Sequence, residues 1–158
     1  MENNENLIYA GFWLRVWASI IDTIAWGMIA LPILMVIYGT DYFSSESVIQ
    51  GPADFLVSYI GPAVVVILFW VYKSATPGKM AISAKIVDAR TGNNPTTGQC
   101  IGRYLGYFVS LIPLGLGIIW VAFDSKKQGW HDKIAGTVVV RKKSGGTEAV
   151  TFPSETRP

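Results

Sequence analysis

Three long apolar stretches constrain the fold of this chain more than any other feature of its sequence. They run from about residue 12 to 38, from about 55 to 72 and from about 101 to 123. The hydrocarbon core of a bilayer is about 30 Å thick and needs roughly 20 helical residues, so each stretch is long enough to cross it. The composition agrees, because 51% of the residues are apolar, only 15% are charged and the mean hydropathy is +0.37. We therefore expect an integral membrane protein.

The charged residues between the apolar stretches indicate how the chain crosses the membrane. Residues 40–54 hold three acidic residues and no Lys or Arg, whereas residues 73–103 hold five Lys or Arg and one Asp. Positive charge is typical of the cytoplasmic side, so the second segment is expected inside the cell and the first outside. The N-terminus is then cytoplasmic, with Arg15 as its flanking positive charge.

The third apolar stretch conflicts with a simple third crossing. A single crossing would place the following residues outside, yet residues 126–143 carry six Lys or Arg, which is typical of the cytoplasmic side. Three residues that disfavour a continuous helix lie in the middle of the stretch: Pro113, Gly115 and Gly117. We therefore expect two half-helices, at about 101–112 and 114–123, that enter the membrane and return to the cytoplasmic side. Three full crossings are the alternative.

Two short segments resemble β-strands. Residues 82–90 (ISAKIVDAR) and 134–141 (IAGTVVVR) are rich in β-branched residues, and the tract TGNNP after the first predicts a turn. If these strands pair, they must lie on one side of the membrane. The expected fold is an all-α integral membrane protein with two transmembrane helices, a third Pro/Gly-broken segment that re-enters or spans, and a small cytoplasmic β-hairpin-like element. We expect one membrane domain over residues 1–143 and a flexible polar tail over 144–158.

The first apolar stretch contains two ionisable residues, Arg15 and Asp22. They are seven positions apart, so on a helix they project from nearly the same face, about 10 Å apart along the axis. An ionised Asp within a membrane costs at least about 2.5–3.5 kcal/mol, so Asp22 should have a partner, hold a proton or face water. The structural alternative is that Arg15 extends to the lipid headgroups and Asp22 joins helices by a hydrogen bond.

The tract FDSKKQGWHDKIAG contains three further candidates, Asp124, His131 and Asp132. His131 is the only histidine and has one adjacent carboxylate, which is too few ligands for a metal site, so we expect no metal. Asp132 could cap a turn before the second strand or reach Arg15, and Asp124 has a similar option. We therefore expect a charge cluster of Arg15, Asp22 and Asp132, with Asp124 as the substitute for Asp132. His131 is a further candidate for this cluster, and its alternative role is an interfacial residue or cap near Trp130.

Other function classes lack support in the sequence. The net charge of +2 is small and the basic residues flank the membrane, which argues against nucleic-acid binding. The tract ATPGKM lacks the spacing of a phosphate-binding loop and instead predicts a turn at the end of the second helix. Because no nucleophile–base pair or nucleotide fingerprint appears, we expect neither enzyme activity nor a cofactor.

Three tracts together resemble the RDD family of membrane proteins, which is named for one Arg and two Asp. They are FWLRVWASIIDTIAW at the start, TPGKMAISAKIVDARTG in the middle and FDSKKQGWHDKIAGTVVV near the end. The resemblance covers roughly residues 10–141. It implies that Arg15 and Asp22 are the first Arg and Asp of the pattern and that Asp132, or else Asp124, is the second Asp. It also implies a multi-pass protein of the bacterial cell (inner) membrane.

The resemblance implies a role in transport, including sodium–proton antiport. The residues fit such a role, since a carboxylate near an arginine can exchange a proton for a small cation while the arginine tunes its pKa. Two or three helices cannot enclose a pathway, so this hypothesis requires a homo-oligomer in the lipid bilayer. The alternative is a membrane regulator or assembly factor that binds another protein through its cytoplasmic strands.

The expected topology predicts how the variant Ser144→Cys reacts with a membrane-impermeant thiol reagent. Residue 144 follows the third apolar stretch, so its thiol should be labelled only when the cytoplasmic face of the membrane is open to the reagent. Labelling of intact cells from outside would contradict the re-entrant arrangement.

Overall fold

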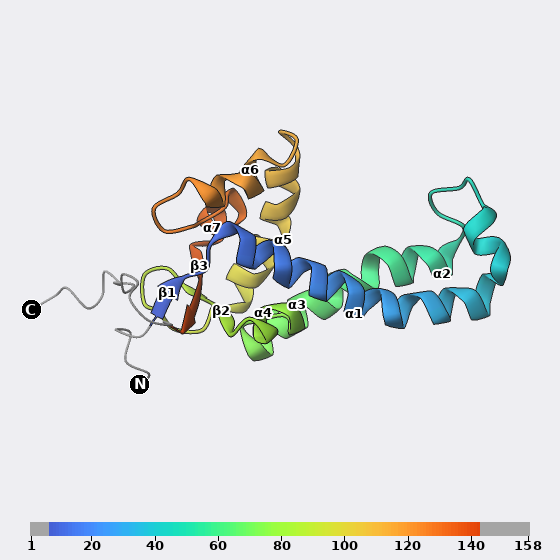
Figure 1. Cartoon of the computed structure of the whole chain (residues 1–158), viewed down its shortest axis with the longest axis horizontal. Helices are drawn as coiled ribbons and strands as arrows, with labels where there is room; N and C mark the ends of the chain where they lie inside the picture. The colour runs from blue at the N-terminus through green and yellow to red at the C-terminus, as the bar shows by residue number, and fades with distance from the viewer. Residues whose placement is uncertain (1–6, 143–158) are drawn as a thin grey trace, which may run out of the picture.

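Two long helical arms form a hairpin that extends well beyond the rest of the chain (Figure 1). The structure, a computed structural model, describes residues 7–142, so the tail expected over 144–158 lies outside the described residues. The first arm is α1, Phe12–Tyr38. The second arm, Pro52–Lys73, is continuous and consists of α2 (Pro52–Phe55), the π-helical η3 (Leu56–Ile60) and α3 (Gly61–Lys73).

Both arms are long and apolar enough to cross a membrane, which confirms the first two predicted spans. In an apolar 18-residue segment of each arm, only 11% of α1 and 6% of the second arm is buried within the protein. Their side chains therefore need an apolar environment outside the chain, which a bilayer supplies. The π turn of η3 ends two residues before Pro62, whose backbone nitrogen has no hydrogen and so cannot donate the usual helical hydrogen bond to the residue four positions earlier.

The remote end of the hairpin is closed by hydrogen bonds around a carboxylate. The connection between the arms includes the short helix η2 (Thr40–Ser44). Asp54, which is 2% exposed, accepts hydrogen bonds from the Tyr42 hydroxyl, the Gln50 backbone amide and the Ser58 hydroxyl. These bonds hold the loop against the start of the second arm.

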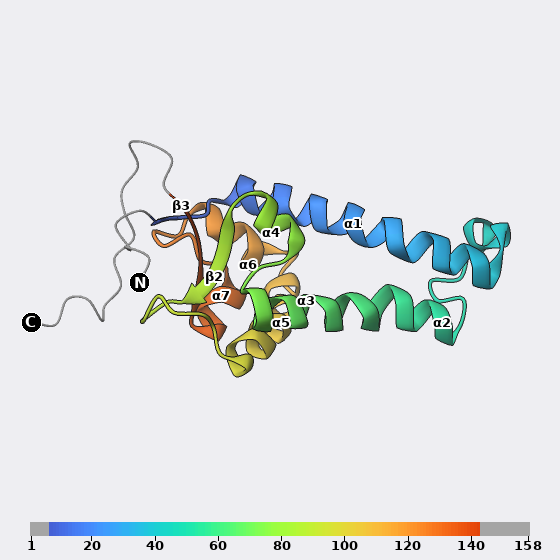
Figure 2. The ribbon, with the colours of Figure 1, turned by 90° about the horizontal axis from the view of Figure 1, so that it is seen from below.

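A three-stranded antiparallel sheet lies at the opposite end of the hairpin (Figure 2). It contains β1 (Leu7–Tyr9), β2 (Ala84–Asp88) and β3 (Thr137–Lys142) in the order β1-β3-β2. The register pairs Ile86 with Val139 and Ile8 with Arg141. The two predicted strands therefore pair, but the hairpin-like element is incomplete as a description, because β1 adds a third strand that is too short to show an alternating pattern.

The third apolar stretch is broken where its Pro and Gly residues predict. Helix α5 spans Thr97–Leu111, and α6 (Leu116–Ile119) continues as η4 (Trp120–Ala122). The two parts are bent by 115°, and the connection between them uses positive φ angles at Leu114 (54°) and Gly115 (78°). Thr96 and Gln99 form a capping box that fixes the start of α5.

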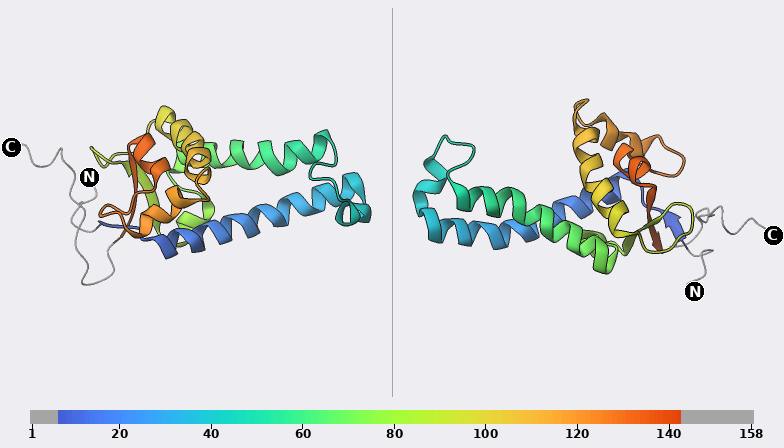
Figure 3. Two further views of the ribbon diagram at one scale, coloured as in Figure 1. Left: turned by 90° about the horizontal axis from the view of Figure 1, so that it is seen from above. Right: turned by 180° about the vertical axis from the view of Figure 1, so that it is seen from behind.

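Two further helices lie at the sheet end of the hairpin, as the views in Figure 3 show. These are α4 (Pro77–Ala81), which lies on α1, and α7 (Trp130–Ala135), which lies on α5. The predicted strand over 134–141 is thus partly helical, because Gly136 ends α7 with a φ of 64° before β3 begins. The buried core contains Ile86 and Val139 from the sheet and Trp70 from α3.

The contact between α5 and α7 predicts a sharp difference between two glycines of one helix. A Cβ atom at Gly106 would lie 2.9 Å from the His131 Cα, whereas one at Gly102 would meet nothing within 4 Å. Gly106→Ala should lower the free energy of unfolding by about 1–3 kcal/mol. The matched control Gly102→Ala should raise it slightly, by up to about 1 kcal/mol, because alanine favours helix. Thermal unfolding in detergent measures both, and equal effects would contradict the packing.

Candidate functional site

Asp132 lies at the centre of a buried ion-pair network. Its side chain is fully buried, and its two oxygens pair with two arginines from different helices. The Arg15 Nη1 atom of α1 donates to Asp132 Oδ2 at 2.5 Å, and the Arg103 Nη1 atom of α5 pairs with Oδ1. Oδ2 also accepts the Gly129 backbone N–H at 3.1 Å, which fixes the start of α7. Asp132 therefore both caps a helix and reaches Arg15.

The two arginines extend this network to the backbone and to the sheet. Arg15 donates through Nε to the Ala10 carbonyl at 3.0 Å and through Nη2 to the Lys127 carbonyl at 2.5 Å. Arg103 is 1% exposed and donates through Nη1 to the Thr137 hydroxyl at 2.9 Å. Its guanidinium also lies 5.3 Å from the centre of the Trp70 ring. The network thus joins α1, α5, α7 and β3.

The pKa values of His131 and Asp132 are both lowered, but for different physical reasons. Burial alone would raise the pKa of Asp132, but the positive charges of Arg103 and Arg15 outweigh it and hold that pKa well below its usual range. Burial lowers the pKa of His131 from 6.5 to about 3, although the charge of Asp132 opposes this shift. His131 stacks on Tyr107 with ring centres 3.9 Å apart, so at neutral pH it is an uncharged packing residue.

Asp124 lies apart from the arginine pair. Its Oδ2 accepts the backbone N–H groups of Lys126 and Gln128, both at 3.1 Å, and its Oδ1 pairs with the Lys133 ammonium at 2.5 Å. These bonds shape the loop that presents the Lys127 carbonyl to Arg15. Asp124 supports the network without entering it.

Asp22 has a different set of partners, and they come from the segment after α3. The Thr76 hydroxyl donates to Asp22 Oδ2 at 2.5 Å, and the Gly78 backbone N–H donates to Oδ1 at 2.7 Å. Gly78 is required for this approach, since a Cβ there would lie 2.0 Å from the Ala18 carbonyl oxygen. Both hydrogen bonds come from neutral donors, in contrast to the two guanidinium groups on Asp132.

Lys79 lies beside this carboxylate and is almost fully buried, with 6% of its surface exposed. Its Nζ atom is 3.5 Å from the Thr76 hydroxyl oxygen and 5.9 Å from the centre of the Trp70 ring. Burial lowers the pKa of Lys79, while the negative charge of Asp22 favours the protonated form. Among the described residues the Lys79 ammonium has one long hydrogen bond, which is energetically unusual for a buried charge.

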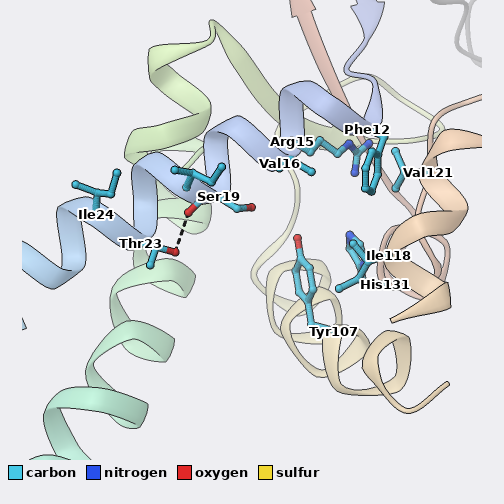
Figure 4. Close-up of a pocket in the computed structure, with 11 residues that line it drawn as sticks. Phe12, Arg15, Val16, Ser19, Thr23, Ile24, Tyr107, Ile118, Val121 and His131 are labelled. Atoms are coloured by element: carbon cyan, nitrogen blue, oxygen red, sulfur yellow. Dashed lines mark hydrogen bonds between the residues drawn. The ribbon is translucent and has the colours of Figure 1, made fainter. Parts of the chain in front are cut away.

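Two of the cavities that open along α1 are lined by both Ser19 and Tyr107. One, of about 430 Å³, lies between α1 and the α5–α7 region and is lined by residues that include Arg15, Ser19, Tyr107 and His131. In Figure 4 the Tyr107 hydroxyl points from α5 toward α1. The second, of about 360 Å³, lies between α1, α3 and α5 and is lined by residues that include Ser19, Asp22, Lys79 and Tyr107. We call this second cavity the Asp22 cleft.

The chemistry that these groups support is charge pairing and proton binding. Within residues 7–142, no group of three or more His, Cys, Asp or Glu side chains is placed to hold a metal ion. The carboxylate of Asp22 can accept a proton or a small cation, and Lys79 can hold a proton beside it. Asp132 is paired with two arginines and an amide, an arrangement that supports a structural role.

The structure divides the sequence-predicted residues into two groups. It brings Arg15 together with Asp132, and it places Asp22 on separate partners of the Thr76–Lys79 segment. Sequence reasoning gave Arg103 and Lys79 no role in the site. A signal for Arg103 was present, since an arginine inside a predicted apolar stretch needs a partner. Lys79 follows a turn and had no such signal.

The fold and the site define a class: a small integral membrane protein whose apolar helical hairpin is tied to a sheet-bearing end by buried ion pairs. Residues 9–136 match the RDD family, and the chain belongs to that family.

Three relatives are uncharacterized proteins, and one of them is described as a membrane protein. The uncharacterized protein YxaI of Bacillus subtilis (strain 168) is 34% identical over 151 residues, covering 84% of this chain and 97% of that protein. The uncharacterized membrane protein YteJ of the same organism is 30% identical over 141 residues, covering 85% and 82%. The uncharacterized protein RP437 of Rickettsia prowazekii (strain Madrid E) is 51% identical over 75 residues, which cover 48% of this chain and only 41% of that protein. No solved structure matches the chain.

The two carboxylates of the closing tract should differ strongly in their effect on stability. Asp132→Asn leaves two buried arginines without a counter-charge, so we expect it to lower the free energy of unfolding by about 3–5 kcal/mol. Asp124→Asn weakens a pair in which the Lys133 side chain is 44% exposed, and should cost no more than about 1 kcal/mol. Unfolding in detergent measures both values. A larger loss for Asp124→Asn would reverse the assignment of Asp132 to the network.

The low pKa of His131 predicts that the protein loses stability in mild acid. Between about pH 6.5 and 3 the unfolded chain binds a proton at this position that the folded protein does not, so stability falls as the pH falls. Lowering the pH from 6.5 to 5 should reduce the free energy of unfolding by up to roughly 2 kcal/mol. The variant His131→Phe has an aromatic ring that cannot titrate, so the unfolding temperature of this variant should fall less over this range. An equal fall in both proteins would mean that His131 is not the group responsible.

Proposed function

We propose that the protein exchanges a small monovalent cation, such as sodium, for a proton across the membrane, with Asp22 as the cation-binding carboxylate. The observation that carries this proposal is the position of Asp22, which lies within an apolar helix and lines a cavity. Among the described residues, the hydrogen-bond donors to its carboxylate are both neutral. A carboxylate in such a place is usually functional. The cluster around Asp132, by contrast, supplies the rigid support.

The sheet supports the membrane orientation that this proposal uses. Strands β1, β2 and β3 form one sheet, although the hairpin arms separate β1 from β2 and the broken α5–α6 segment separates β2 from β3. Two crossings by the arms return the chain to its starting side. A re-entrant α5–α6 segment then keeps β3 on that side, and the basic residues around it favour the cytoplasm.

The proposal requires more than one copy of the chain. Two arms and a bent segment do not surround a pathway, and the apolar faces of α1 and α3 are largely exposed along their length. A homo-oligomer can enclose the Asp22 cleft between neighbouring copies. The alternative, a regulator that binds a foreign membrane protein, would instead give a stoichiometric complex with that protein on purification in mild detergent.

Flux in proteoliposomes tests the proposal. Asp22→Asn keeps the shape of the side chain and can still accept from the Gly78 amide, so the protein should assemble, but cation-dependent proton flux should fall to the level of protein-free vesicles. The control Asp41→Asn removes an exposed carboxylate at the remote end of the hairpin and should leave the flux unchanged. Unchanged flux in Asp22→Asn, with normal assembly, would overturn the proposal.

A further inference from the structure

The segment after α3 links Lys79 to Asp22 through a single hydroxyl. The Thr76 hydroxyl donates a hydrogen bond to Asp22 Oδ2 at 2.5 Å, and its oxygen accepts a hydrogen bond from the Lys79 ammonium at 3.5 Å. Lys79 is 6% exposed and lines the Asp22 cleft together with the carboxylate. A buried cation and a carboxylate therefore share one cavity and one bridging hydroxyl.

The charges around the cleft limit how many positive charges it can hold. On α1, Asp22 and Arg15 act on Lys79, and on α5 so do Arg103 and Tyr107. From α3 the Trp70 ring covers the ammonium at 5.9 Å. Among the described residues, the two arginines and a protonated Lys79 face the two carboxylates Asp22 and Asp132, which already leaves one excess positive charge.

A further cation on Asp22 would add a second excess positive charge beside these groups. Arginine does not release its proton in proteins, so the two guanidinium groups stay charged. Lysine does release its proton when it is buried, so Lys79, which lines the cleft with Asp22, can restore the balance. Burial indeed lowers the pKa of Lys79.

We propose that Lys79 carries the exchanged proton, so that a proton on Lys79 and a cation on Asp22 exclude one another. This inference rests on the exchange function proposed above. In the step, a monovalent cation binds the Asp22 carboxylate, the N–H bond of the Lys79 ammonium breaks, and the proton passes to water in the cleft. One positive charge enters and one leaves, so the net charge of the site is unchanged. The reverse step reloads the proton and expels the cation.

Proton release on sodium binding tests this assignment with the full-length protein in detergent. Wild type in weak buffer should release about one proton for each sodium ion bound, since the charge balance requires it. Lys79→Gln should bind sodium without releasing a proton, and at least about tenfold more tightly, because the competing charge is gone. The control Lys73→Gln removes an exposed lysine at the end of α3 and should keep the wild-type proton release.

The outcomes separate the two proposals. If wild type carries cation-dependent proton flux but Lys79→Gln still releases one proton per sodium, the Lys79 assignment is wrong and the exchange function stands. If wild type shows no such flux, both are overturned. If Lys79→Gln does not fold, wild type labelled with ¹³C at the lysine ε-carbons decides: sodium should move one lysine signal to the position of a neutral amine, and an unmoved spectrum would overturn the assignment.

Discussion

The burial of one carboxylate, Asp132, is the constraint on which the rest of this structure depends. A fully buried negative charge is tolerable only with close counter-charges, and Asp132 obtains them from Arg15 on α1 and Arg103 on α5. Arg15 lies 117 positions away in the sequence, so this pair fixes the end of the transmembrane hairpin to α7. The strand β3 follows α7 directly, and the sheet is therefore held against the same point.

Arg15 and Asp22 lie on one face of α1, but they have different partners. Arg15 donates hydrogen bonds to Asp132 and to two backbone carbonyls, which is a rigid structural arrangement. Two turns further along, Asp22 receives only a hydroxyl and an amide, and it opens onto a cavity that a buried lysine also lines. Asp132 stabilises the fold through its charged partners, whereas Asp22, which has two neutral donors, is the carboxylate that we propose takes part in cation exchange.

The sequence predicts the membrane helices and the break in the third stretch because hydropathy and Pro/Gly placement are local properties. It also predicts the pairing of β2 with β3. It does not predict β1, since Leu7–Tyr9 is too short for a strand pattern, or α7, whose β-rich neighbours mask it. The helical spacing of Arg15 and Asp22 suggests one cluster, but their partners depend on where α4 and α7 pack, which is a tertiary property.

A double-mutant cycle on the free energy of unfolding tests the central claim most directly. It compares Arg15→Gln, Asp132→Asn and the combination of both in detergent-solubilised protein. If the buried pair joins α1 to α7, the two single changes are strongly non-additive, with a coupling energy of about 1–3 kcal/mol. Additive effects, within about 0.5 kcal/mol, would contradict the account, because the two side chains would then act independently.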